Sequence, residues 1–303
     1  MKQWLSIARH IGQVTGDIFL VGHQQNIAGG SINGAFVLTG QNGEKYFVKI
    51  NKSGQQAMFE AEARGLQEIA STAAIRVPQP VCFGDDQQQS YIVMEYLEMN
   101  RQANQSILGE QLAAMHAVTA DAFGWAMDNT IGATPQPNAW MGDWLTFWRE
   151  QRLGYQLRLA ASNGYGGELQ VLGERLLVDM PSLLEGREVR PSMLHGDLWG
   201  GNVAGLDVTG SGATRGRQGT PVIFDPALYY GDREADLAMT YVFGGFDADF
   251  YASYQSVLPL DVGFAVRKTF YNIYHIINHL NLFGGGYHAQ AIDMLKRVIA
   301  EIS

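Results

Sequence analysis

Two polar loops, each next to a short apolar run, constrain this chain more than any other feature. Residues 193–203 read MLHGDLWGGNV, so that His-Gly-Asp and an Asn lie between apolar residues. Residues 222–226 read VIFDP, which predicts a strand that ends on a lone aspartate, twenty-eight residues after Asp197. The chain must therefore place two carboxylates and an amide beside apolar strands.

A carboxylate, an amide and a second carboxylate in this order are typical of the base and metal site of kinase-type phosphotransferases. Asp197 is predicted to accept the proton of an attacking hydroxyl. Asn202 and Asp225 offer the hard oxygen ligands that Mg²⁺ prefers. Lys49 is predicted to hold the α- and β-phosphates of ATP, and Glu62 to hold Lys49. Taken singly, Asp197 would be better explained as a helix-cap or turn residue and Asn202 as a turn former. The ordered set predicts phosphoryl transfer from ATP.

The pairing of Lys49 with Glu62 is predicted from local geometry. In the expected strand 45–50 the period of two places Lys49 on the face opposite to Val48. In the expected helix 55–70, Glu62 lies within the apolar stripe, where a carboxylate needs a partner. Lys49 is the nearest candidate. The alternative is that Glu62 extends to water.

The remaining patterns divide the chain into a strand-rich first part and a helical second part. We expect a small N-terminal lobe, residues 1–97, with one main helix, and a larger lobe, residues 98–303, which begins with a linker at 98–104. The other expected strands are 18–22, 35–39 and 90–97, the expected helices are 107–116, 140–159, 167–180, 233–244 and 263–283, and an exposed hairpin loop is expected at 205–220.

Composition limits the partners and the location. The formal charge of -9 over 303 residues repels nucleic acid and anionic lipid, and no basic patch is apparent. No apolar run reaches the ~20 residues of a membrane helix, and Arg9 and His10 interrupt the start before a signal-type core forms. Cys82 is the only cysteine, which excludes an internal disulfide and a thiolate metal cluster. We expect a cytoplasmic enzyme that is a monomer or a weak dimer.

A glycine-rich segment, residues 29–34, lies between two expected strands, where glycine amides can approach phosphates. It is neither a Walker A motif, because no Gly-Lys-Ser/Thr follows, nor a Rossmann loop, because a strand follows instead of a helix. His195 is predicted to be a structural loop residue.

Two spaced sets of aromatic and imidazole side chains have competing interpretations. Trp140, Trp144 and Trp148 recur every four residues, which favours helix packing over a sugar-binding cleft. His275 and His279 also lie four residues apart, but Ile276 follows the first histidine where a zinc protease would have Glu. Core or supporting roles are therefore favoured for both histidines.

Together these residues resemble the fructosamine (ketosamine) 3-kinase family, within the aminoglycoside phosphotransferase and kinase-like superfamily. The resemblance covers nearly the whole chain; its more specific parts are the Pro-Gln-Pro-Asn stretch and the Asp-Leu-Trp-Gly-Gly-Asn form of the catalytic loop. The matching segments are 29–33, 46–49, 59–66, 94–97, 123–124, 135–140, 143–144, 195–202, 225–227, 230–238 and 274–284.

The resemblance implies an α+β, protein-kinase-like fold of two lobes, with ATP and Mg²⁺ as cofactors. It implies phosphorylation of the 3-hydroxyl of a ketosamine, either a small molecule or a glycated protein, and hence removal of the sugar as repair. It assigns Asp197 as the base, Asn202 and Asp225 as metal ligands, and Trp199 as a wall of the sugar site. The residues that it assigns to the nucleotide are Gly29, Gly30, Ser31, Asn33, Lys49, Glu62, Met94, Glu95 and Leu97.

Some positions leave alternatives open. Many relatives carry Cys where this chain has Ser31, so thiol-based regulation does not transfer. Asp232 replaces a histidine of eukaryotic relatives; it is a candidate substrate contact, with Glu234, or else the cap of the helix that follows. Asp236 resembles the buried aspartate that anchors the catalytic loop. A kinase of the same fold for an aminoglycoside, choline or another metabolite, and a non-catalytic pseudokinase, are the rival functions.

Overall fold

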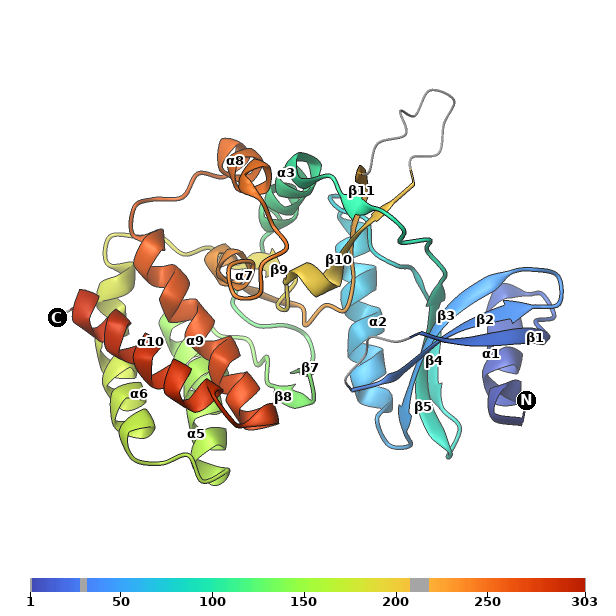
Figure 1. Ribbon diagram of the computed structural model, residues 1–303, viewed down its shortest axis with the longest axis horizontal. Helices are drawn as coiled ribbons and strands as arrows, with labels where there is room; N and C mark the ends of the chain where they lie inside the picture. The colour runs from blue at the N-terminus through green and yellow to red at the C-terminus, as the bar shows by residue number, and fades with distance from the viewer. Residues whose placement is uncertain (1, 28–31, 208–217, 303) are drawn as a thin grey trace. The chain divides into compact units, whose positions relative to one another are not determined.

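The structure, a computed structural model, describes residues 2–27, 32–207 and 218–302. They form two compact units (Figure 1): Met1–Asn104 with Val203–Pro226, and Gln105–Asn202 with Ala227–Ser303. The division therefore differs from the single boundary expected at residue 97, because Val203–Pro226 returns to the N-terminal unit.

A five-stranded antiparallel sheet forms the framework of the N-terminal unit (Figure 1). Strand order is β1-β2-β3-β5-β4, which makes β3 a central strand. Lys49 on β3 is in register with Ala35 on β2 and with Ile92 on β5. Hydrogen-bonded ladders on both sides therefore fix the main chain that carries Lys49. The strands are β1 (Val21–Ile27), β2 (Gly34–Gly40), β3 (Lys45–Lys52), β4 (Pro80–Asp85) and β5 (Gln89–Glu95).

One helix covers each face of this sheet. Helix α1 (Leu5–Thr15) packs its buried residues against Val48 and its neighbours in one apolar cluster. Helix α2 (Gln56–Ser71) lies over the opposite face, which carries Lys49. The predicted alternation of Val48 and Lys49 between two faces is thus confirmed.

The start of the chain differs from the prediction. Helix α1 was not expected, and the strand expected at 18–22 is shifted to β1. Ile18 is 81% exposed and Leu20 is also exposed. These two apolar side chains are therefore not part of the core, although their apolar character predicted a strand. β1 itself is a polar edge strand, whose exposed side chains give no alternating signal.

A smaller sheet completes the N-terminal unit. Strands β10 (Val203–Leu206) and β11 (Gln218–Ile223) form a hairpin, and β11 pairs with β6 (Gln102–Ala103). The expected linker 98–104 therefore contributes a strand to this unit. The centre of the loop expected at 205–220, residues 208–217, lies outside the described residues.

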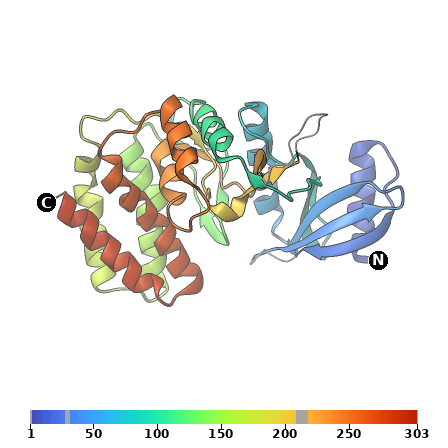
Figure 2. The same cartoon turned by 45° about the horizontal axis from the view of Figure 1, so that its top comes forward.

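Helices dominate the C-terminal unit (Figures 1 and 2), and α5, α6, α9 and α10 pack side by side. The five expected helical regions are all present, although the region expected from Trp140 begins at Trp144, where Asp143 caps it. Helices α8 and α10 were not expected. The helices are α3 (Gln105–His116), α4 (Trp144–Phe147), α5 (Gly154–Ser162), α6 (Glu168–Asp179), α7 (Arg233–Met239), α8 (Ala248–Val257), α9 (Phe264–Phe283) and α10 (Tyr287–Glu301), with a π-helical segment at Trp148–Leu153.

Two short antiparallel strand pairs support the helices of this unit: β7 (Asn129–Ile131) with β8 (Thr134–Gln136), and β9 (Ser192–Leu194) with β12 (Tyr229–Gly231). β9 leads directly into the polar loop that contains Asp197. The fold is the expected α+β one, with a β-rich N-terminal region and a helical C-terminal region.

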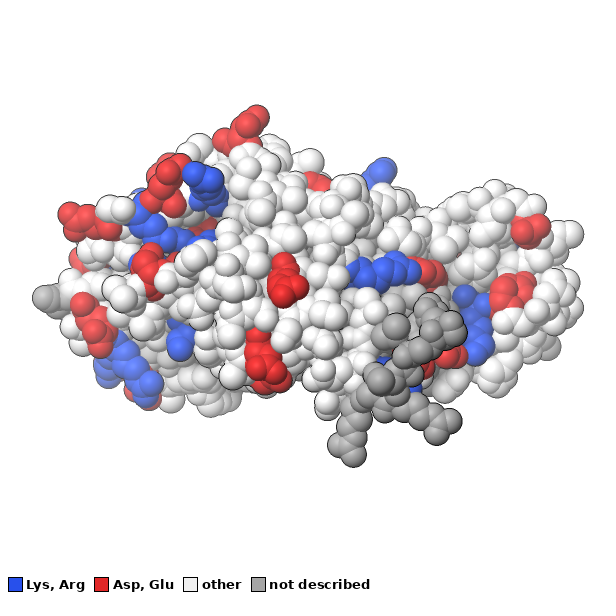
Figure 3. Space-filling model, turned by 90° about the horizontal axis from the view of Figure 1, so that it is seen from above, with Lys and Arg blue, Asp and Glu red and all other residues white. Residues whose placement is uncertain are grey.

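Charged side chains of both signs are interspersed on the face shown in Figure 3. Among the described residues no helix combines the length and the apolar character needed to cross a bilayer.

Candidate active site

Lys49 and Glu62 form the ion pair that the sequence predicted. Lys49 Nζ lies 2.6 Å from Glu62 Oε1, and Lys49 is only 7% exposed. Glu62 projects from the buried side of α2 toward the face of β3 that carries Lys49. The prediction of this pairing is confirmed, and the alternative in which Glu62 extends to water is wrong.

Asp225 provides a second partner for Lys49, with Oδ1 2.5 Å from Nζ. It follows β11 by two residues and has a positive φ of 59°, a conformation that costs free energy for a residue with a Cβ. Its side chain is 43% exposed, in contrast to those of Lys49 and Glu62. Of the three groups, Asp225 is therefore the one that a solvent-borne cation can reach.

Burial and charge act in opposite directions on this triad. Burial alone would lower the pKa of Lys49, but the charges of Asp225 and Glu62 outweigh it and raise that pKa. Burial raises the pKa of Glu62, an effect that Lys49 opposes. Lys49 is thus held as a cation.

The other expected nucleotide residues are only partly described. Gly29, Gly30 and Ser31 lie outside the described residues. Asn33, near the end of the glycine-rich segment, accepts a hydrogen bond from Asn51 Nδ2 on β3 at 2.7 Å.

Three of the residues expected to bind the nucleotide, Met94, Glu95 and Leu97, lie at or just after the end of β5. Met94 is buried, and Glu95 accepts from Arg76 at 2.6 Å while its main-chain N–H donates to Gln79 O at 2.9 Å. Leu97 accepts a main-chain hydrogen bond from Met99. The Glu95 side chain is therefore engaged within the N-terminal unit.

Asp236 anchors the loop that contains Asp197 in the C-terminal unit. Its carboxylate accepts from the main-chain N–H groups of His195 and Gly196 at 2.6 and 2.8 Å. Burial opposes ionisation of Asp236, but hydrogen bonds from the His116 side chain and from the Gly196 main chain lower its pKa. The residue therefore acts structurally, as its position in the sequence suggested.

A series of hydrogen-bonded side chains, Arg233, Tyr254 and His116, forms a relay that ends at Asp236. The sequence patterns did not reveal it. Arg233 can only donate, and it donates to the Tyr254 hydroxyl oxygen at 3.0 Å. The Tyr254 hydroxyl lies 2.8 Å from His116 Nδ1, and because the Asp236 carboxylate can only accept, His116 Nε2 carries the proton that faces it at 3.2 Å. Because His116 and Asp236 are 120 residues apart, no local pattern could link them.

Asp197 and Asn202 are brought together by the loop itself. Asn202 Nδ2 donates to the main-chain oxygen of Asp197 at 2.9 Å and to its Oδ2 at 3.3 Å. Because the amide nitrogen is used in this way, Oδ1 is the atom with which Asn202 can bind a cation. The Asp197 N–H donates to Nδ1 of the fully buried His195, which agrees with a scaffold role for that imidazole.

Asp232 and Glu234 require a correction. Asp232 is 1% exposed, caps α7 through the Glu234 N–H, and is held by Arg187 and by the Tyr271 hydroxyl. Burial opposes ionisation of Asp232, but Arg187 lowers its pKa. Glu234 is equally buried and forms two hydrogen bonds with Arg267, at 2.6 and 2.9 Å. Their oxygens are occupied by these partners, so we no longer assign them to substrate.

The tryptophans have separate environments. Trp144 and Trp148 are buried among aromatic rings of α9, which confirms the helix-packing interpretation for these two. Trp140 lies outside the helix and is exposed. Trp199, in the catalytic loop, is 38% exposed, with Phe243 against its edge at 5.8 Å between centroids.

Neither histidine of the spaced pair is built into a metal centre. His275 is buried in α9, and His279 packs against Phe243, Phe283 and Tyr287. Throughout the described ranges, no group of three or more His, Cys, Asp or Glu side chains is arranged to hold a metal ion. A magnesium site here would therefore depend on phosphate oxygens and water as well as protein, as is usual for this ion at phosphoryl-transfer sites.

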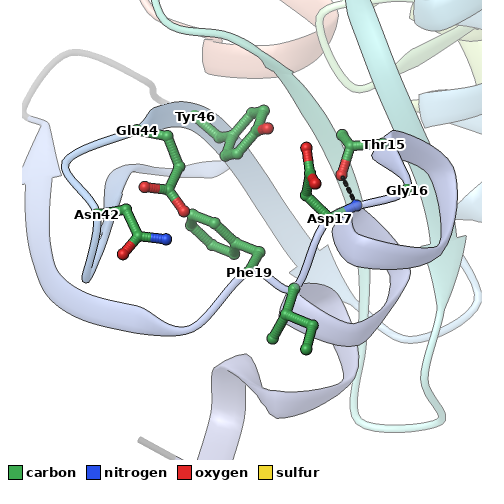
Figure 4. Close-up of a pocket in the computed structure, with 8 residues that line it drawn as sticks. Thr15, Gly16, Asp17, Phe19, Asn42, Glu44 and Tyr46 are labelled. Atoms are coloured by element: carbon green, nitrogen blue, oxygen red, sulfur yellow. Dashed lines mark hydrogen bonds between the residues drawn. The ribbon is translucent and has the colours of Figure 1, made fainter.

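A cavity of about 550 Å³ lies elsewhere in the N-terminal unit (Figure 4). Asp17 and Glu44 line it with Phe19 and Tyr46, at the end of α1 and beside the hairpin of β2 and β3. Among the predicted site residues that the structure describes, none lines this cavity.

Comparison with known proteins gives one consistent family. The family profile described as fructosamine kinase matches residues 3–301. A Synechocystis sp. protein named "probable ketoamine kinase" is 46% identical over 299 residues, which cover 98% of this chain and 97% of that protein. The Arabidopsis thaliana chloroplastic protein-ribulosamine 3-kinase is 41% identical over 274 residues, 89% of this chain and 80% of that protein.

Solved structures agree. A candidate fructosamine-3-kinase of Haemophilus somnus superposes with a TM-score of 0.86 and 28% identity, covering 98% of this chain and 97% of that one. The ADP-bound aminoglycoside phosphotransferase APH(2″)-Ib has a TM-score of 0.61 and 12% identity, with 98% of each chain covered. The second likeness concerns the kinase-like fold alone.

Proposed function

The chain belongs to the fructosamine kinase family, and from this premise we propose that it transfers the γ-phosphoryl group of ATP to the 3-hydroxyl of ribulosamines and fructosamines. It is a kinase that phosphorylates ketosamines, and kinases of this family use ATP. Phosphorylation at this position destabilises the sugar–amine adduct, so the proposed role is repair of glycated amines, free or on proteins.

Asp197 is the proposed base. The substrate oxygen attacks the γ-phosphorus, the bond to the β–γ bridging oxygen breaks, and the hydroxyl proton passes to the Asp197 carboxylate. Asp236 holds the main chain just before Asp197, and Asn202 Nδ2 restrains the carboxylate. This anchored loop is the observation that carries the proposal, because catalysis of phosphoryl transfer depends mainly on positioning.

The donor atoms fit ATP with Mg²⁺. Lys49 is a buried cation suited to the α- and β-phosphates, and Glu62 orients it. Asp225 and Asn202 Oδ1 are the oxygens that would hold Mg²⁺. When bound, this ion neutralises negative charge on the phosphates. The amicoumacin kinase hAmiN, which shares the fold with a TM-score of 0.57, is described with AMP-PNP and Ca²⁺.

Trp199 is the proposed wall of the sugar site. Its indole is partly exposed, and its loop position places it two residues after the base. An aromatic face of this kind suits the apolar side of a sugar ring.

A substrate panel tests the reaction. ADP release is measured with ribulosamines, erythrulosamines and fructosamines, both free and on lysozyme glycated in advance, and with an aminoglycoside and choline as competing classes. We expect turnover only with ketosamines. Turnover confined to choline or the aminoglycoside would overturn the proposal, and ATP binding without any turnover would favour a pseudokinase.

Substitution of Asp197 tests its role as base. Asp197→Asn keeps the size and removes the basic oxygen, so we expect kcat to fall by about 10²–10⁴ with ATP affinity, measured by calorimetry, largely unchanged. Wild-type turnover in this variant would show that another group takes the proton.

Asp225→Ala is expected to act on the metal instead. It should raise the Mg²⁺ concentration that gives half-maximal rate, because it removes a proposed ligand. A magnesium response equal to that of the wild type would remove Asp225 from the metal site.

A further inference from the structure

The Pro-Gln-Pro-Asn stretch has no role in the mechanism above, yet its side chains are among the most buried polar groups in the C-terminal unit. Gln136 ends β8 and is 1% exposed. It is paired in register with Asn129 on β7, and its Nε2 donates to Asn129 Oδ1 at 2.8 Å. Two buried amides thus lie side by side on one small hairpin.

Both amides donate to the same piece of main chain. Gln136 Nε2 donates to Ala227 O at 3.1 Å, and Asn129 Nδ2 donates to Leu228 O at 2.8 Å. The Tyr274 hydroxyl donates to Gln136 Oε1 at 2.6 Å. That third bond fixes which way the Gln136 amide points, since its oxygen must face Tyr274 and its nitrogen Ala227.

Ala227 in turn contacts the catalytic loop directly. Its N–H donates to His195 O at 2.8 Å. Gly196, with a φ of +82°, lies so close that a Cβ placed on it would be 2.1 Å from Ala227 O. The carbonyl that Gln136 holds is therefore the one packed against the residue before Asp197.

A buried cation stabilises the other side of the hairpin. Arg152 is fully buried and donates to Pro137 O at 2.7 Å and to Asn138 Oδ1 at 2.6 Å. Asn138 Nδ2 then donates to Asn129 Oδ1 at 3.0 Å. The guanidinium also stacks on the ring of Tyr229, 3.9 Å from its centroid. The hairpin is thus fixed from both sides, so Gln136 has little freedom to move.

We propose that Gln136, oriented by Tyr274, is a positioning residue that holds Ala227 against the catalytic loop and so sets the position of Asp197. This inference rests on the proposed role of Asp197 as base. A displacement of the loop by a fraction of an ångström would change the alignment of the attacking hydroxyl without changing the groups proposed to bind the nucleotide.

The test compares two substitutions of buried glutamines. Gln136→Leu removes the donor to Ala227 O. Gln89→Leu is the control, because Gln89 is also buried and donates to a main-chain carbonyl, Gln3 O, in the N-terminal unit. We expect both variants to unfold at lower temperature, but only Gln136→Leu to lower kcat, by about tenfold or more, with the KM for ATP within about twofold of the wild type.

A second variant keeps the proposal testable if Gln136→Leu does not fold. Tyr274→Phe removes only a hydroxyl, which orients Gln136 and also has a hydrogen bond with Gln156, so we expect a smaller fall in kcat in the same direction. If both single variants fold, the double variant should lose no more than Gln136→Leu alone, because both changes act through one amide.

Three outcomes would overturn the positioning role: unchanged kcat in folded Tyr274→Phe, an equal fall of kcat in Gln89→Leu, or additive losses in the double variant. Asp197→Asn, assayed in parallel, separates this from failure of the proposed function. If Asp197→Asn retains turnover, the base is misassigned. If Asp197→Asn is inactive but Tyr274→Phe has a normal kcat, only the positioning role of Gln136 is rejected.

Discussion

At the scale of single residues, the second partner of Lys49 changes what the loss of Glu62 costs. Breaking a buried ion pair typically costs ~3–5 kcal/mol when the remaining charge has no partner. Here Asp225 lies 2.5 Å from Lys49 and stays in place. The substitution therefore tests the orientation of Lys49 more than its burial.

For Glu62→Gln we expect a loss of less than ~3 kcal/mol in the free energy of unfolding, measured with urea, and a raised KM for ATP. Glu60→Gln is the matched control on the same helix. Its partner Arg64 is 3.8 Å away and exposed, so the expected loss is below ~0.5 kcal/mol. Equal effects of the two substitutions would contradict the pairing of Glu62 with Lys49.

The contrast between Glu62 and Asp232 shows for which residues the partners can be predicted from the sequence. Glu62 stands in an apolar stripe of one helix, and Lys49 is only thirteen residues away, so local periodicity joined them. The partners of Asp232 are Arg187, forty-five residues before it, and Tyr271, thirty-nine residues after it. Cap and substrate contact were therefore equally compatible with the sequence, and only the folded chain distinguishes them.

At the scale of elements, one glycine controls the contact between α3 and α8. A Cβ on Gly109 would lie 2.3 Å from Phe250 O and 2.9 Å from Tyr254 N. These are main-chain atoms of α8, which cannot give way as a side chain can. The same two helices carry His116 and Tyr254 of the relay to Asp236.

Gly109→Ala should therefore separate these helices and lower the free energy of unfolding by about 1–3 kcal/mol. Gly166→Ala is the control, since a Cβ there would have no atom within 4 Å. Chemical denaturation of both variants checks this, and a Gly109→Ala protein as stable as Gly166→Ala would show that the two helices are not packed as described.

The elements that the sequence revealed are those with a strong local signal. Helix α2 has a buried stripe at helical spacing, and strands β2, β3 and β5 are runs rich in apolar residues that have buried residues at their centres. β1 is a polar edge strand, so its pairing with β2 depends on backbone hydrogen bonds that leave no mark in the order of side chains.

At the scale of the whole molecule, a buried imidazole links stability to pH. Burial, and next the neighbouring His279, lower the pKa of His275 from 6.5 to about 3. Above pH 6.5 the group is neutral in both states and has no effect. Below that value His275 binds a proton in the unfolded chain but not in the folded chain. The free energy of unfolding therefore falls as the pH is lowered, until the pH reaches about 3.

We expect the wild type to lose on the order of 1 kcal/mol per pH unit through this group between pH 6 and pH 4. His275→Gln should remove that part of the slope, whereas substitution of the exposed His23 by Gln should not. Urea unfolding at several pH values measures it. If the free energy of unfolding has the same slope against pH in the wild type and in His275→Gln, His275 is protonated in the folded protein.

The sequence alone predicted the pairing of Lys49 with Glu62, which the structure confirms. It also led to the proposals of Asp197 as the base and of Asn202 and Asp225 as metal ligands. These are short-range patterns, because strand and helix periods place neighbouring side chains on known faces. The tertiary structure decided which buried polar groups serve as scaffold. Gln136, His116, Asp232 and Asp236 each act on residues far away in sequence, and a hydrogen bond closes only when folding brings donor and acceptor together.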